Sequence, residues 1–134
     1  MSIRRPIPAA LAVVIRERSV LLVRRANPPD AGLWGFPGGK IGAGELLAAA
    51  AVREVFEETG VRADAGPIST AVDAFDRNHD GTVREQYVLV AALCRWREGE
   101  PIAVDDALEA AWHDIASLDD DLLVTSFGVS RVCG

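Results

Sequence analysis

Residues 38–61 read GGKIGAGELLAAAAVREVFEETGV, and this stretch decides how the rest of the chain is interpreted. A glycine-rich turn is expected first, followed by a helix from Leu46 to Thr59, because helix-forming residues dominate there. Gly60 stands where a left-handed glycine usually ends a helix. Glutamates gather in the last turns of this helix, and like charges three and four residues apart repel one another. A divalent cation is the simplest group that would offset this repulsion.

The predicted helix has an apolar face and an acidic face. At about 100° per residue, residues that suit a core fall on one face: Ala48, Val52, Val55, Phe56 and Thr59. The opposite face carries Glu54, Glu57 and Glu58, which converge over one helical turn. Carboxylate oxygens suit Mg²⁺ or Mn²⁺, which keep waters for substrate phosphates, whereas the absence of His and Cys disfavours zinc. The sequence therefore predicts a magnesium site, with Mn²⁺ as the alternative cation.

Composition favours one domain that spans residues 1–134. A chain of 134 residues with 49 % hydrophobic content suits a single globular unit with its own core. The net charge of -6 gives no overall attraction to nucleic acid or to an anionic membrane. We therefore expect neither partner, and a phosphate-bearing ligand would need local cations or clustered arginines.

The cysteines and the first residues predict a cytoplasmic protein. Cys94 and Cys133 have no CxxC spacing and form no disulfide framework, so they are expected to be reduced thiols. Two prolines interrupt Met1–Pro8 and no long apolar core follows, which does not fit a signal peptide. No apolar run approaches the ~20 residues of a membrane-spanning helix.

The remaining pattern predicts several strands in non-alternating order. Apolar runs indicate strands at 9–15, 20–23, 33–36, 68–75, 86–96 and 110–115, of which 86–96 is expected to be the longest and central. The first two are predicted to form a hairpin, and two prolines make 27–30 irregular. A short helix is expected over 125–132. This order favours an α+β fold with a mixed sheet over a doubly wound one.

The same central stretch resembles the Nudix hydrolase signature, whose fixed positions are all matched: Gly39, Glu45, Arg53, Glu54, Val55, Glu57, Glu58, Gly60 and Val61. So many fixed positions make a chance match improbable. The resemblance extends through residues 34–38 and, more loosely, to the Gly-Glu-Pro segment at 99–101 of MutT-type members. It implies the family's α/β/α sandwich around a mixed β-sheet, in agreement with the strand pattern.

The resemblance also implies a site and a reaction. Glu54, Glu57 and Glu58 would bind the divalent metal together with a backbone carbonyl at Gly38. Arg53 would orient the glutamates. Glu45 would hold the loop and Arg53 in place. Water would attack a phosphorus atom of a nucleoside diphosphate linked to a further group.

The base that activates this water is left open by the resemblance. It would be one of the three helix glutamates or an acid of a later loop, for which Asp105 is the first choice and Asp106 and Glu109 are rivals. Further basic residues are candidate phosphate contacts: Arg24, Arg25, Arg77 and Arg84. Trp34 and Phe36 could stack on a base, but aromatics beside a strand more often belong to the core.

The substrate is expected to be a small nucleotide, either ADP-ribose or a nucleoside triphosphate. Arg77 replaces the proline that ADP-ribose pyrophosphatases of the family often carry beyond the signature, and the SQPWPFP array of NADH pyrophosphatases is absent. The alternative from another class is a non-catalytic domain that only binds a nucleotide or a protein partner. Such members usually lose signature glutamates, whereas this chain keeps them. The resemblance also makes a homodimer possible, because dimers are common among members of the family.

Overall fold

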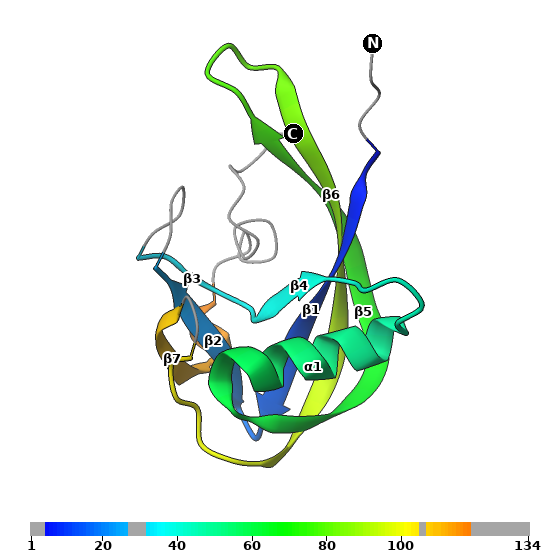
Figure 1. Cartoon of the computed structure of the whole chain (residues 1–134). Coiled ribbons are helices and arrows are strands. Elements are labelled where there is room, and N and C mark those ends of the chain that lie inside the picture. Colours follow the sequence, from blue (N-terminus) through cyan, green and yellow to red (C-terminus); the bar gives the residue numbers. More distant parts are fainter. Residues whose placement is uncertain (1–4, 27–31, 105–106, 119–134) are drawn as a thin grey trace.

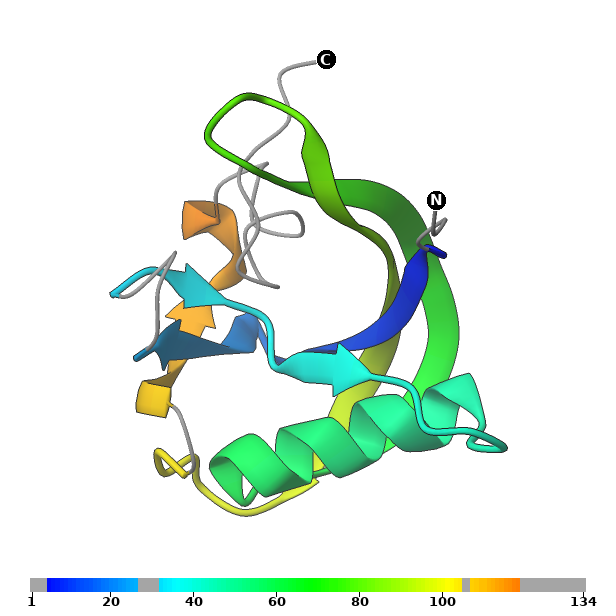
Figure 2. The ribbon, with the colours of Figure 1, turned by 45° about the horizontal axis from the view of Figure 1, so that its top comes forward.

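The computed structural model describes residues 5–26, 32–104 and 107–118. In these ranges one helix lies along a strongly curved sheet (Figures 1 and 2). The elements in chain order are β1 (Ile7–Arg16), β2 (Ser19–Arg25), β3 (Trp34–Gly35), β4 (Gly38–Lys40), α1 (Leu47–Thr59), β5 (Arg62–Arg77), β6 (Val83–Glu98), β7 (Ala107–Asp114) and the 3-10 turn η1 (Ile115–Ser117). No helix in the described ranges is long and apolar enough to cross a membrane.

The strands of the described residues form one mixed sheet with the order β3-β2-β1-β6-β5. β1 and β6 run parallel, from Ile7 opposite Tyr87 to Ile15 opposite Arg95. The other pairs are antiparallel, and β4 and β7 join the sheet by pairing with β1 and β2. The expected α+β fold around a mixed sheet is therefore confirmed.

The predicted strands are all present, and β1, β2, β5, β6 and β7 are longer than expected. β5 and β6 each contain 16 residues, so the strand predicted at 86–96 does not exceed its neighbour in length. β6 is an interior strand, but the middle of the sheet belongs to β1. The irregular segment expected at 27–30 and the helix expected over 125–132 lie outside the described residues.

Two apolar clusters cover the two faces of β1. The cluster beneath α1 is rich in small residues, among them Ala10, Ala12, Ala50, Ala51 and Ala92. The cluster on the other face contains Leu11, Leu22, Leu89 and Phe36, with Trp34 packed against it. Phe36 is only 6 % exposed, which confirms that it belongs to the core, whereas Trp34 is partly buried. Because successive side chains of a strand alternate between faces, the apolar run of β1 supplies both clusters.

The face by which α1 packs on the sheet differs from the predicted one. Its buried residues are Ala50, Ala51, Val55 and Thr59. Phe56, predicted to be core, is 41 % exposed, and the Arg62 guanidinium lies 4.4 Å from its ring centroid. The prediction was thus right for Val55 and Thr59 and wrong for Phe56. Alanines on both the helix and the sheet let the two backbones approach closely, which turns the helix about its axis.

Residues 38–40 form strand β4 instead of the predicted turn. Gly38 pairs with Leu11 and Gly39 pairs with Ala10, so the glycines extend the sheet from the edge of β1. A Cβ at Gly38 would collide with the Ala10 carbonyl oxygen and the Leu11 backbone. These glycines therefore serve close packing between strands, and α1 lies directly against them.

Candidate active site

Glu54 and Glu58, one helical turn apart, both face strand β4. The Gly38 N–H donates to Glu58 Oε2 at 3.0 Å. The Glu54 carboxylate lies so close to Gly39 that a Cβ there would be 2.5 Å from Glu54 Oε1. The predicted placement of both glutamates opposite the packed face was therefore wrong. At position 39, only glycine leaves room for the Glu54 carboxylate between helix and strand.

The Glu54 carboxylate affects the ionisation of Glu58. Burial, and then the negative charge of Glu54, raise the pKa of Glu58 to about 8, although the Gly38 N–H acts in the opposite direction. Two carboxylates that share one desolvated site disfavour full ionisation of both. A bound cation would remove this conflict. Their hard oxygen atoms and the close glycine backbone fit a divalent ion such as Mg²⁺, which commonly takes one or two protein carboxylates.

Arg53 links the helix, β4 and the intervening loop. Its guanidinium donates to both carboxylate oxygens of Glu45, at 2.6 and 2.9 Å. Nη1 donates to Glu54 Oε1 at 2.8 Å and to Glu57 Oε1 at 2.7 Å, and Nη2 to the Lys40 carbonyl at 3.3 Å. These bonds raise the pKa of Arg53 further above its ordinary value. The planar fork of arginine suits such simultaneous contacts better than a lysine ammonium does.

Glu45 fixes the loop that precedes α1. Besides the two bonds from Arg53, Glu45 Oε1 accepts the Gly42 N–H at 2.9 Å. The Arg53 guanidinium and then the Gly42 N–H lower the pKa of Glu45 to about 2. This carboxylate therefore stays ionised near neutral pH, and the loop stays bonded to the helix.

Glu57 is oriented differently from the other two helix glutamates. Its side chain is 46 % exposed, and its Oε1 is bonded to Arg53. Within the ranges that the structure describes, no three His, Cys, Asp or Glu side chains are grouped closely enough to share one metal ion. The local geometry thus brings Glu54 and Glu58 together and leaves Glu57 at the solvent side.

The three acids predicted as candidate bases in a later loop do not share one position. Asp105 and Asp106 lie outside the described residues, so the first choice for a loop acid stays a prediction. Glu109 is in β7, where its Oε1 accepts from Arg24 Nη2 at 2.5 Å. Glu109 is thus engaged by a neighbouring strand.

The candidate phosphate-binding arginines divide into two groups. Arg77 bonds the Gly81 carbonyl and Arg84 bonds Asp76, so both belong to the β5–β6 hairpin. Arg25, at the end of β2, lies near enough to Glu58 for its charge to oppose the rise in the carboxyl pKa. Sequence patterns did not separate Arg25 from the others, because its nearness to α1 depends on strand pairing.

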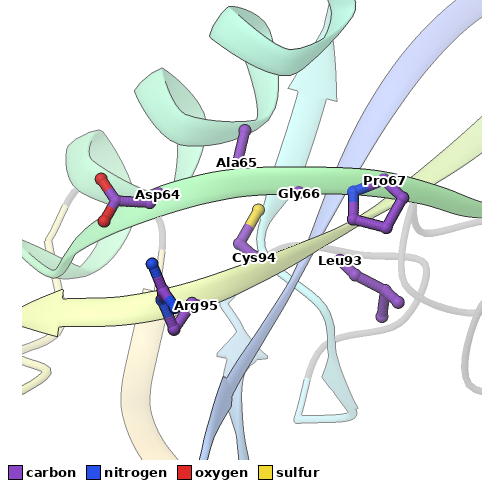
Figure 3. Close-up of a pocket in the computed structure, with 7 residues that line it drawn as sticks. All are labelled: Asp64, Ala65, Gly66, Pro67, Leu93, Cys94 and Arg95. Carbon is purple, nitrogen blue, oxygen red and sulfur yellow. The ribbon is translucent and has the colours of Figure 1, made fainter.

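A separate pocket of about 280 Å³ lies on the β5–β6 hairpin, at the bulge around Gly66 and Pro67 (Figure 3). Asp64 and Arg95 lie at one end of it. None of the helix glutamates lines it. Burial raises the pKa of Cys94, which also lines it, to about 11, so this thiol stays protonated. The pocket therefore offers no activated nucleophile.

Comparison with protein families identifies the chain. The family model of the NUDIX domain matches residues 5–128. The chain belongs to the Nudix family. The Nudix hydrolase resemblance of residues 39–61 is thereby confirmed, and the family supports hydrolysis of phosphorus anhydrides.

Similar Nudix proteins carry different names. The ADP-ribose pyrophosphatase of Methanocaldococcus jannaschii is 31 % identical over 113 residues, which cover 84 % of this chain and 64 % of that protein. The "Putative 8-oxo-dGTP diphosphatase 2" of Mycobacterium tuberculosis H37Rv is 36 % identical over 109 residues, or 80 % of this chain and 72 % of that protein. The chain thus spans somewhat less than two thirds of its archaeal relative.

A solved structure supports the fold over nearly the whole chain. The MutT NUDIX hydrolase from Burkholderia pseudomallei superposes with a TM-score of 0.78 at 28 % identity, covering 92 % of this chain and 95 % of that one. The likeness covers nearly all of that relative, so the sheet and the helix keep the Nudix arrangement.

Proposed function

We propose that this Nudix protein is a Mg²⁺-dependent hydrolase that cleaves the pyrophosphate linkage of a nucleoside diphosphate joined to a further group. The observation that carries the proposal is the pair of Glu54 and Glu58 carboxylates held against Gly38 and Gly39. Mn²⁺ is expected to replace Mg²⁺, because both prefer carboxylate oxygens. The names of the relatives support ADP-ribose and 8-oxo-dGTP as the first substrates to test.

The proposed site consists of residues that hold the cation and an arginine that positions them. Glu54, Glu57 and Glu58 would hold the cation, together with a backbone carbonyl at Gly38. The cation, when bound, would neutralise negative charge on the substrate phosphates. Arg53 keeps the carboxylates in place, since it bonds two of them and the loop at once.

The proposed reaction is attack of water on phosphorus. A proton must leave this water, and a helix glutamate or Asp105 would accept it. The charge of Arg25 lies near Glu58, so Arg25 is proposed to contact a substrate phosphate at the same end of the site. Phosphoryl transfer depends mainly on positioning and on charge neutralisation, which these residues supply.

A substrate panel tests the proposal. The chain is incubated with ADP-ribose, dGTP, 8-oxo-dGTP, NADH and dinucleoside polyphosphates, with and without Mg²⁺, and the products are separated by chromatography. We expect cleavage of at least one compound that stops when EDTA removes the metal. Tight nucleotide binding without cleavage of any compound would instead identify a binding module.

Gly38→Ala and Gly39→Ala are expected to have different effects, although the residues are neighbours in β4. The new methyl group in Gly39→Ala would displace the flexible Glu54 side chain, so Mn²⁺ affinity should fall by about 10–100-fold while Tm changes little. In Gly38→Ala the new methyl group would collide with the backbone of β1, which cannot move aside as a side chain can. The Tm of Gly38→Ala should therefore fall. Titration calorimetry and thermal unfolding measure the two effects. Equal metal affinity in Gly39→Ala and wild type would contradict the role of Glu54.

A further inference from the structure

The last turn of α1 carries two of the proposed metal ligands. Glu57 and Glu58 lie at the negative end of the helix dipole, and the turn contains no basic residue. When ionised, Glu58 also lies one turn from the carboxylate of Glu54, and like charges at this spacing repel. A helix end of this composition favours fraying unless groups outside the helix hold it.

The segment that follows β6 holds this turn by two backbone hydrogen bonds. The Ile102 N–H donates to the Thr59 carbonyl at 3.0 Å, and the Val104 N–H donates to the Glu58 carbonyl at 3.1 Å. The last carbonyls of a helix have no partner within it, so these donors satisfy groups that would otherwise be free. Glu58 is thus held through its backbone by Val104 and through its carboxylate by Gly38.

A cluster at the start of this segment fixes its position. We call it the arginine clip, and its members are Arg16, Trp96, Glu100 and Trp112. The Arg16 guanidinium lies 3.8 Å from the Trp96 ring centroid and 5.6 Å from that of Trp112. Arg16 Nη1 donates to Glu100 Oε1 at 2.7 Å, and Trp112 Nε1 donates to Glu100 Oε2 at 3.3 Å. Trp96 Nε1 donates to the Gly99 carbonyl at 2.8 Å.

The arginine clip joins the end of β1, the end of β6 and strand β7 to the connecting segment. An isolated exposed ion pair contributes little, and Glu100 is 68 % exposed. Here the pair is reinforced, because Arg16 stacks on an aromatic face and Trp112 bonds the same carboxylate. The clip therefore anchors Glu100, two residues before Ile102, whose N–H holds the end of α1.

We propose that Arg16 and Glu100 are positioning residues for the metal site. They fix the segment from Gly99 to Val104, and the N–H groups of this segment hold the turn that carries Glu58. Neither Arg16 nor Glu100 is bonded to the carboxylates of the helix glutamates, so the effect of the two residues passes through the backbone. The proposal rests on the proposed function, because it assigns these residues to the same metal site.

Two measurements on the whole chain test the proposal. Mn²⁺ binding by titration calorimetry reports the site itself, and amide hydrogen exchange by NMR reports the Ile102 and Val104 N–H groups. The variants are Arg16→Ala, Arg16→Lys and Glu100→Gln. The matched control is Glu98→Gln, which removes an equally exposed carboxylate that pairs with Arg62 outside the clip.

We expect Mn²⁺ affinity to fall by about tenfold in Arg16→Ala and Glu100→Gln. The two amides should exchange faster in the same variants. Arg16→Lys should lie between these variants and wild type, because lysine keeps the charge but stacks less well. Glu98→Gln should match wild type in both measurements. Glu100→Gln changes one exposed group, so it keeps the test valid if Arg16→Ala loses its fold.

Wild-type Mn²⁺ affinity and amide exchange in Glu100→Gln and Arg16→Lys would overturn the positioning role. An equal loss in Glu98→Gln would also overturn it, because the effect would then follow from any lost surface charge. A wild-type chain that binds no Mn²⁺ would overturn the proposed function itself, and the positioning role with it. The Mn²⁺ titration of the wild-type chain therefore distinguishes failure of the proposed function from failure of the positioning role alone.

Discussion

Glu58→Gln will lower turnover by about a hundredfold or more while the domain stays folded. Changing a residue that merely supports a metal ligand typically lowers metal affinity or activity by about 10–100-fold. Changing a direct ligand should lower activity by at least as much. Glutamine removes the negative charge that the cation needs. Its side-chain carbonyl can still accept the Gly38 N–H that Glu58 Oε2 accepts in the wild type, so the packing of α1 on β4 is kept.

The measurement is kcat with the substrate found in the panel, at saturating Mg²⁺, beside thermal unfolding of the metal-free chain. Glu98→Gln is again the control, because Glu98 is exposed at the end of β6 and pairs with Arg62. Glu57→Gln should also lose activity by orders of magnitude, because Glu57 is a proposed ligand. Near wild-type rates in both Glu57→Gln and Glu58→Gln would refute the assignment of the metal to this helix.

Val55→Asp is expected to unfold the domain. Val55 has no exposed surface and lies in the cluster between α1 and the sheet. A carboxylate there would be desolvated without a partner among the alanines and valines of that cluster. Such a change can cost more than about 4 kcal/mol, which approaches the entire stability of a small domain, typically about 5–15 kcal/mol.

Circular dichroism during urea and thermal unfolding measures this effect. Ala49→Asp is the matched control, because Ala49 is an exposed residue of the same helix. It adds the same charge to α1 without burying it, so its unfolding midpoint should stay close to wild type. A cooperative transition of Val55→Asp at the wild-type midpoint would show that this face of α1 is not the core.

The elements that the sequence predicted well are those specified by neighbouring residues. α1 ends at Gly60 with φ 76°, as the glycine after Thr59 indicated. Runs of alternating apolar and polar residues, and continuous apolar runs, located the strands. Their pairing was beyond reach, since the parallel contact of β1 with β6 joins residues about 80 positions apart in the register, such as Ile7 with Tyr87. Pairing at that distance leaves no local pattern.

For the candidate site, the sequence proposed the residues, and the structure changed the expected arrangement of Glu54 and Glu58. Helical spacing brought Glu54, Glu57 and Glu58 to one turn, but their burial depends on the rotation of α1 about its axis. That rotation is set by the small residues Ala50 and Ala51 against the sheet. The face predicted from periodicity included Ala48 but neither of these two alanines. Their small volume is what decided the packing.

Residues 38–61 were sufficient to predict the family and the helix, and to propose carboxylates as the metal ligands. Those properties depend on residue identity and on spacing within a few turns. The tertiary structure alone decided that Glu54 and Glu58 meet β4, that Arg25 acts on Glu58, and that Arg16 and Glu100 hold the loop behind the helix. These contacts join segments far apart in the chain. They form because folding places β1, β4, β6 and α1 side by side, a result of packing that no local pattern encodes.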